Sequence, residues 1–108
     1  MDRPQDVGPL ATFLVERYSP GIDLATLRGE LPRLEAAARA MTAAGTPVMH
    51  VVSILMPVDE VVFSLIQAGD EQLVRELGAR AGLPADRIAA AITLNPGEVP
   101  EPAGGPTS

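Results

Sequence analysis

Residues 48–67 read Val-Met-His-Val-Val-Ser-Ile-Leu-Met-Pro-Val-Asp-Glu-Val-Val-Phe-Ser-Leu-Ile-Gln, two apolar runs rich in β-branched residues. Such residues favour the pleated, half-buried surface of a sheet. The runs are separated by residues 57–60, Pro-Val-Asp-Glu, and Pro and Asp favour turns. The pattern predicts a β-hairpin with a four-residue loop. Because both arms are apolar on both faces, we expect the chain's own helices to cover one face and a partner subunit the other.

The segment before the hairpin predicts a strand and a long helix. Residues 10–18 are expected to form the first strand, followed by a turn. Asp23 can cap a helix that runs to about residue 44, where Gly45 provides a C-terminal cap. Pro32 lies inside the helix and is expected to kink it or to mark a restart. The helix has one apolar stripe at three- and four-residue spacing, formed by Leu24, Leu27, Leu31, Leu34, Ala38 and Met41.

The segment after the hairpin predicts a second helix and a last strand. Asp70 can cap a helix to about Ala81, and residues 82–84, Gly-Leu-Pro, stop it. Residues 85–88 predict a short helical turn. The short apolar run 90–94 predicts the last strand.

The expected order is therefore strand, helix, strand, strand, helix, strand. This order is the α+β, ferredoxin-like βαββαβ plan, an antiparallel sheet with two helices on one face. We expect a flexible tail at residues 1–9 and the folded domain at 10–94. The proline- and glycine-rich segment 95–108 is expected not to fold, because it cannot bury enough apolar surface.

Composition excludes several classes of function. A net charge of −6 argues against partners such as nucleic acid and anionic membrane, which need basic patches. The absence of cysteine excludes disulfides and thiolate metal sites. The sequence has no stretch long enough for a transmembrane helix and no apolar signal core, so we expect a cytoplasmic protein.

Side-chain alternation along the strands suggests where the chemistry lies. Phe13 and Val15 are expected to face the helices, which sends Glu16 and Tyr18 to the opposite face. In the hairpin, the even-numbered positions are expected on that opposite face: His50, Val52, Ile54, Val62, Ser64 and Ile66.

On this reasoning Glu16, Tyr18, His50 and Ser64 share one face. In the βαββαβ plan the third strand lies between the first and second, so the backbones of Glu16 and His50 are roughly 10 Å apart. A carboxylate near an imidazole can orient it as a general base. The structural alternative is that His50 is a hydrogen-bonded residue of the fold without a ligand.

Three segments resemble a known family. They are 13–21, Phe-Leu-Val-Glu-Arg-Tyr-Ser-Pro-Gly; 53–60, with Pro57 and Asp59-Glu60; and 74–88, with Ala-Gly-Leu-Pro at 81–84. The chain resembles the small actinobacterial nickel-binding ferredoxin-like proteins over about residues 12–94. This resemblance implies a dimeric α/β barrel, in which two sheets face each other and enclose a cavity.

The metal site of the family is only partly present. Relatives often have His at the position of Val52 and Cys at the position of Ser64, whereas Glu16 matches the family's carboxylate. Glu16 and His50 are then the candidate metal ligands. Nickel prefers several imidazoles or thiolates, so we expect nickel binding to be weak and no other cofactor.

The sequence therefore supports a homodimer, joined through its sheet faces, that binds a small and largely apolar molecule. If the protein is an enzyme, the analogy with related dimeric barrels implies a cofactor-free cyclase or isomerase. There His50 is the general base, Glu16 orients it and Tyr18 donates to an oxyanion. The alternatives are a nickel-binding protein and a structural or interaction module without ligand. The remaining ligand contacts are expected from Leu14, Val52, Ile54 and Ser64.

Overall fold

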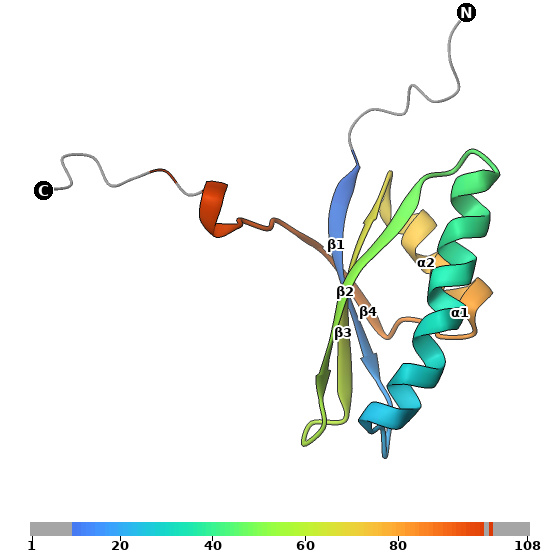
Figure 1. Ribbon diagram of the computed structural model, residues 1–108, viewed down its shortest axis with the longest axis vertical. Helices are drawn as coiled ribbons and strands as arrows, with labels where there is room; N and C mark the ends of the chain where they lie inside the picture. Colours follow the sequence, from blue (N-terminus) through green and yellow to red (C-terminus); the bar gives the residue numbers. More distant parts are fainter. Residues whose placement is uncertain (1–9, 99, 101–108) are drawn as a thin grey trace, which may run out of the picture.

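The computed structural model describes residues 10–98 and residue 100. It has the predicted order of four strands and two helices, with one short 3-10 helix after them (Figure 1). The elements are β1 (Ala11–Tyr18), α1 (Leu24–Ala43), β2 (Val48–Met56), β3 (Val61–Ala68), α2 (Glu71–Ala81), β4 (Arg87–Ala91) and η1 (Pro96–Glu98).

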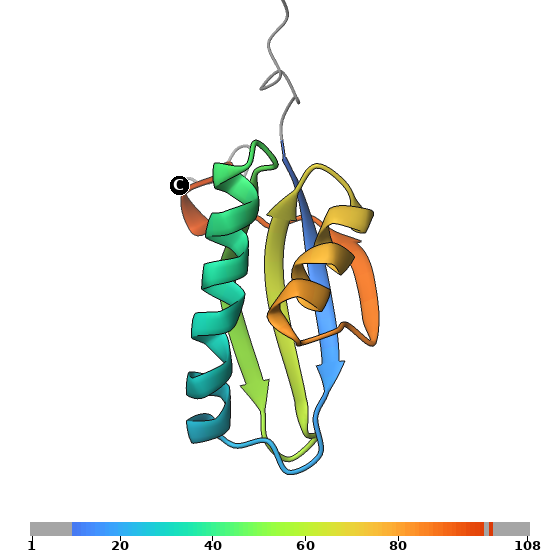
Figure 2. The same cartoon turned by 90° about the vertical axis from the view of Figure 1, so that its right-hand side faces the viewer.

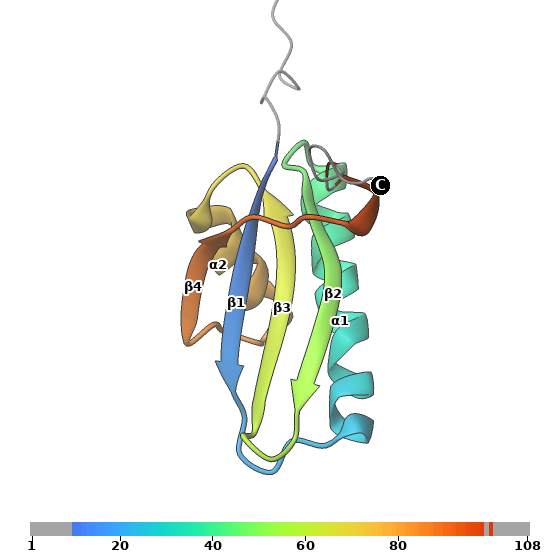
Figure 3. The same ribbon diagram turned by 90° about the vertical axis from the view of Figure 1, so that its left-hand side faces the viewer.

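The four strands form one antiparallel sheet in the order β2-β3-β1-β4. Both helices lie on the same face of this sheet (Figure 2). Neither α-helix lies on the opposite face, and of the described residues only the segment after β4 with the short η1 lies on that side (Figure 3). The predicted ferredoxin-like α+β plan, with the third strand between the first and second, is therefore confirmed.

Local capping interactions set the ends of α1. The Asp23 carboxylate accepts a hydrogen bond from the backbone N–H of Thr26 at 2.8 Å. After the helix, Gly45 adopts φ +98° and its N–H donates to the carbonyl of Thr42. The helix runs through Pro32 as a single element, so the alternative of a restart at this residue is wrong.

The second helix also follows the prediction. The Asp70 carboxylate accepts from the backbone N–H of Leu73 at 2.9 Å, and Gly82 ends the helix in the left-handed conformation at φ +73°.

The last strand begins earlier than predicted. β4 spans Arg87–Ala91, whereas the sequence predicted a helical turn at 85–88 and a strand at 90–94. Two tertiary contacts cause the difference. The backbone N–H of Asp86 donates to the carbonyl of Glu16, and Ile88 pairs with Val15 and packs against the core.

The core lies between the helices and the sheet and is almost entirely aliphatic. Phe13 belongs to it, and Val15 packs against it, which confirms that these two residues face the helices. The remaining buried core residues come from the β1–α1 connection, the helices, β2, β3 and the α2–β4 connection: Ile22, Leu27, Leu34, Ala38, Met41, Val48, Val62, Ile66, Ala68, Val74, Leu77, Ala81 and Leu83.

The tails fall mostly outside the described residues. The predicted tail 1–9 lies there, as do residues 99 and 101–108 of the predicted C-terminal tail. Within that second tail, the 3-10 helix at Pro96–Glu98 departs from the expectation of no fold. Neither helix within residues 10–98 is long and apolar enough to cross a membrane.

Candidate functional site

A β-bulge between His50 and Val52 decides where the side chains of β2 point. The extra residue shifts the alternation by one position, so even positions face the helices before the bulge and odd positions after it. In β3, the buried residues Val62 and Ile66 place the even positions toward the helices. The predicted outward orientation is therefore wrong for His50, Val62, Ser64 and Ile66, and it is confirmed for Val52 and Ile54.

We call the sheet surface away from the helices the open face (Figure 3). The pairing of Glu16 with Phe63 and of Leu14 with Leu65 places these side chains on it. His50 and Ser64 lie on the helix side of the sheet. The other five predicted site residues share the open face: Leu14, Glu16, Tyr18, Val52 and Ile54. The members of the open face are Thr12, Leu14, Glu16, Tyr18, Met49, Val52, Ile54, Met56, Val61, Phe63, Leu65, Gln67, Arg87, Ala89 and Ala91.

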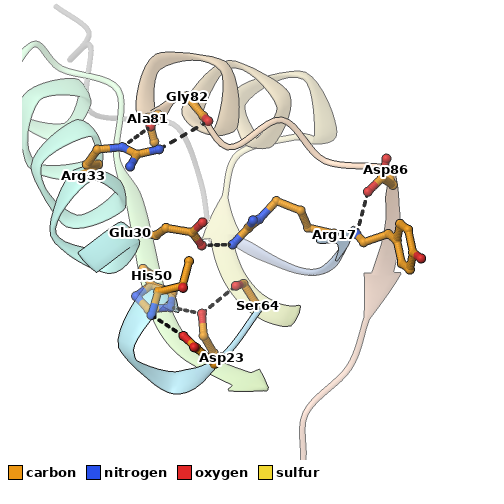
Figure 4. A network of polar contacts seen from close by, with 12 residues as sticks. Arg17, Asp23, Glu30, Arg33, His50, Ser64, Ala81, Gly82 and Asp86 are labelled. Carbon is orange, nitrogen blue, oxygen red and sulfur yellow. Dashed lines mark hydrogen bonds and ion pairs between the residues drawn. The ribbon is translucent and has the colours of Figure 1, made fainter. Parts of the chain in front are cut away.

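His50 is part of a hydrogen-bond chain between α1 and the sheet (Figure 4). Its Nδ1 lies 2.5 Å from Glu35 Oε2, and its Nε2 lies 2.8 Å from Ser53 Oγ. Ser53 Oγ lies 2.6 Å from Ser64 Oγ. One consistent assignment is that Nδ1–H donates to Glu35, Ser53 donates to Nε2 and Ser64 donates to Ser53. The partner of His50 is therefore Glu35, and the predicted pairing with Glu16 is wrong.

This chain has the residue order of a catalytic acid–His–Ser triad, but its serine is poorly placed for a substrate. A cavity of about 30 Å³ between the helices and the sheet is lined partly by Ser64 and is too small for a substrate, with room only for water. A groove of about 480 Å³ between α1 and β2 is bordered by Glu35 and His50. Ser53 lines neither the cavity nor the groove. The geometry thus favours the structural alternative for His50, which ties α1 to the sheet.

The sequence reasoning missed Glu35, although a signal for it exists. Glu35 lies four residues after Leu31 and three before Ala38, so it stands at the edge of the buried stripe of α1. Its side chain is 45% exposed, whereas that of His50 is only 7% exposed. A carboxylate in this position can reach inward to a polar group on the sheet.

Ion pairs lie on both faces of β1. On the helix side, Arg17 Nη2 lies 2.6 Å from Glu30 Oε1, with both side chains largely buried (Figure 4). On the open face, Arg87 Nη1 lies 3.6 Å from Glu16 Oε1. Glu16 therefore supplies a carboxylate to the open face, with a guanidinium beside it.

Tyr18 lies at the end of β1, beside the hairpin loop. Its hydroxyl donates to Glu60 Oε1 at 3.2 Å, and Glu60 Oε2 accepts from the backbone N–H of Gly21 at 2.8 Å. The hydrogen bond to Glu60 and the negative charge of this carboxylate raise the pKa of Tyr18 above its ordinary value.

This contact can be tested by optical titration, because Tyr18 is the only tyrosine of the chain. We expect Glu60→Gln to lower the pKa of Tyr18 toward about 10, since the charge is removed. Asp59→Asn, which removes a neighbouring charge, is the control and should change the titration less. The Tyr18–Glu60 interaction contributes stability below about pH 10 and loses it as the pH rises through the folded-state pKa. Identical titration curves for the native chain and Glu60→Gln would contradict the contact.

The two predicted metal ligands do not fit a common site within one subunit. Glu16 lies on the open face, whereas His50 lies on the helix side with both ring nitrogens in hydrogen bonds. Over residues 10–98 and residue 100, no group of three or more His, Asp or Glu side chains is arranged to hold a metal ion. Weak nickel binding stays a prediction.

Comparison with known proteins adds evidence on the fold. A scan against protein-family models gives no match, and a search of curated proteins gives none either. Among solved structures, the SCO4226 protein of Streptomyces coelicolor A3(2) is similar, with a TM-score of 0.68 and 19% identity. The similarity covers 79% of this chain and 100% of the Streptomyces chain. At this identity it shows the fold alone, and the chain therefore shares a small α/β architecture with an actinobacterial protein.

Proposed function

We propose that the protein is a homodimer joined through its open faces, which holds a small and largely apolar molecule between the two sheets. The open face carries this proposal. Apolar side chains from β2 are 39–51% exposed on it, although they lie within a regular strand: Met49, Val52, Ile54 and Met56.

The size of this surface supports a partner. Four strands about 4.8 Å apart and about eight residues long, at roughly 3.3 Å per residue, present a face of roughly 500 Å². This face includes the polar side chains of Thr12, Glu16 and Gln67, and its apolar part is comparable with the largest apolar patch of a typical monomer, about 300–600 Å², which often serves an interaction. Burial stabilises by about 25 cal/mol per Å² of apolar surface, so a second copy of the same face is favourable.

The distribution of side-chain size supports a space for a ligand. Phe63, Leu65 and Ile54 make the β2–β3 half of the open face bulky, whereas Ala89 and Ala91 make the β4 edge shallow. Two packed sheets lie about 10 Å apart, so shallow regions leave unfilled volume between them. Because the side chains that border this volume are mostly apolar, an apolar molecule suits it.

Glu16 and Tyr18 supply the polar contacts of this ligand. In the enzymatic version, a cyclase or isomerase, Glu16 serves as the acid or base and the Tyr18 hydroxyl as a hydrogen-bond donor. His50 has no part in this version, because it lies on the helix side of the sheet.

Analytical ultracentrifugation and native mass spectrometry test the proposal. We expect a dimer at micromolar concentration, because exposure of the open face is costly in water. We also expect an extractable apolar molecule bound to the dimer. A monomer at this concentration would contradict the proposed two-sheet barrel and the cavity inside it. A dimer that neither carries nor takes up apolar compounds would instead be the interaction module without ligand.

A further inference from the structure

The segment Ile92–Glu98, which we call the arm, leaves the sheet after β4. Ile92 is 92% exposed and Leu94 is 71% exposed, so two large apolar side chains have little cover from their own domain. They are two residues apart, and in an extended chain such residues point to the same side. The arm therefore presents an apolar pair to its surroundings.

The arm has local structure of its own. The backbone N–H of Glu98 donates to the Asn95 carbonyl at 2.8 Å, and the Glu98 carboxylate accepts from the Asn95 N–H at 2.9 Å. The first hydrogen bond closes the 3-10 turn, and the second is the glutamate half of a capping box at the start of a helix. Both hydrogen bonds lie inside the arm, so it can keep this turn while it contacts another molecule.

The direction of the arm indicates which molecule it contacts. The arm projects from the sheet on the side opposite to the helices, which is the side of the open face (Figures 1 and 3). Residues 92–95, if extended, span about 13 Å, and the three residues of η1 add about 6 Å, whereas two packed sheets lie about 10 Å apart. In a dimer joined through the open faces, the arm is long enough to reach beyond the interface onto the second subunit.

We propose that the arm of each subunit docks on the other subunit of the homodimer, with Ile92 and Leu94 as its apolar anchors. This inference rests on the proposed dimer. It adds that the interface extends beyond the two sheets, and that the segment after β4 belongs to it.

Photo-cross-linking can test this contact, because the chain contains no cysteine and one introduced thiol is a unique label site. Leu94→Cys is coupled to a thiol-reactive benzophenone and irradiated. Val58→Cys is the matched control, since Val58 is 94% exposed and lies in the hairpin loop at the other end of the strands. We expect cross-links between subunits from position 94 at several times the yield from position 58.

The other outcomes separate the two proposals. If the labelled protein sediments as a dimer but position 94 forms only cross-links within one chain, or none, the arm inference is overturned and the dimer stands. Equal yields from both positions also overturn it. If the labelled and the native protein both sediment as monomers, the proposed dimer and the arm inference fail together.

Substitution in the full chain gives a second measurement. The double change Ile92→Asp and Leu94→Asp is expected to weaken the dimer at least tenfold, because two apolar anchors become charged. Val58→Asp is the control and should leave the dimer dissociation constant unchanged. An unchanged constant in the arm variant, with circular dichroism like that of the native chain, would overturn the inference.

Discussion

His50→Ala is expected to lower the free energy of unfolding by about 2–4 kcal/mol, which would be a large effect for a single substitution. The imidazole is 7% exposed and bonds Glu35 and Ser53 at once. Its removal leaves a cavity between α1 and the sheet. It also leaves Ser53 and Ser64 without the acceptor at the end of their hydrogen-bond chain.

Chemical denaturation followed by circular dichroism measures this loss, at one fixed protein concentration because the stability of the proposed dimer would depend on concentration. Val58→Ala is the control and is expected to change the free energy of unfolding by no more than about 0.5 kcal/mol, since this side chain is almost fully exposed. A loss below about 1 kcal/mol for His50→Ala would contradict the structural role.

A double-mutant cycle with Ser53→Ala separates the network from simple packing. If His50 and Ser53 act together, the two substitutions should be non-additive by about 0.5–3 kcal/mol. Additive losses would mean that His50 does not act through Ser53, which leaves packing and the hydrogen bond to Glu35 as its contributions.

Ile54→Glu is expected to convert the proposed dimer to a monomer. Ile54 is 48% exposed on the open face, so a single subunit can accept a carboxylate there. In the dimer the same carboxylate would be buried in an apolar interface without a partner, which is costly. We expect the dimer dissociation constant to rise at least about 100-fold, equivalent to roughly 3 kcal/mol.

Sedimentation velocity over a range of concentrations measures this effect, and circular dichroism checks that the subunit still folds. Val58→Glu places the same charge on an exposed loop residue and should leave the dimer intact. A folded Ile54→Glu variant with the native dissociation constant would show that the open face is not the interface. The ligand should be lost together with the dimer, because both use the same surface.

Much of the fold could be predicted because its signals are local. Asp23 and Asp70 cap the helices through backbone groups three residues away, and Gly45 and Gly82 adopt the positive φ angles that end them. The hairpin loop at 57–60 also lies where Pro and Asp indicated it. Each of these features depends on a few neighbouring residues, so the sequence suffices to find it.

The candidate site could be predicted only in part. Leu14, Glu16 and Tyr18 lie on the expected face, since β1 alternates without interruption from Phe13. Alternation fails in β2 because one extra residue near Val51 reverses the direction of every later side chain.

The sequence by itself determined the four strands and two helices, their order, the aliphatic core and the hairpin that is apolar on both faces, but not the bounds of β4. The tertiary structure decided which side chains meet. It turned His50 inward to Glu35, joined Ser64 to Ser53 and left Glu16 on the open face. The physical reason is that strand register and bulges follow from packing over the whole sheet, whereas helix caps and turns follow from hydrogen bonds within a few residues.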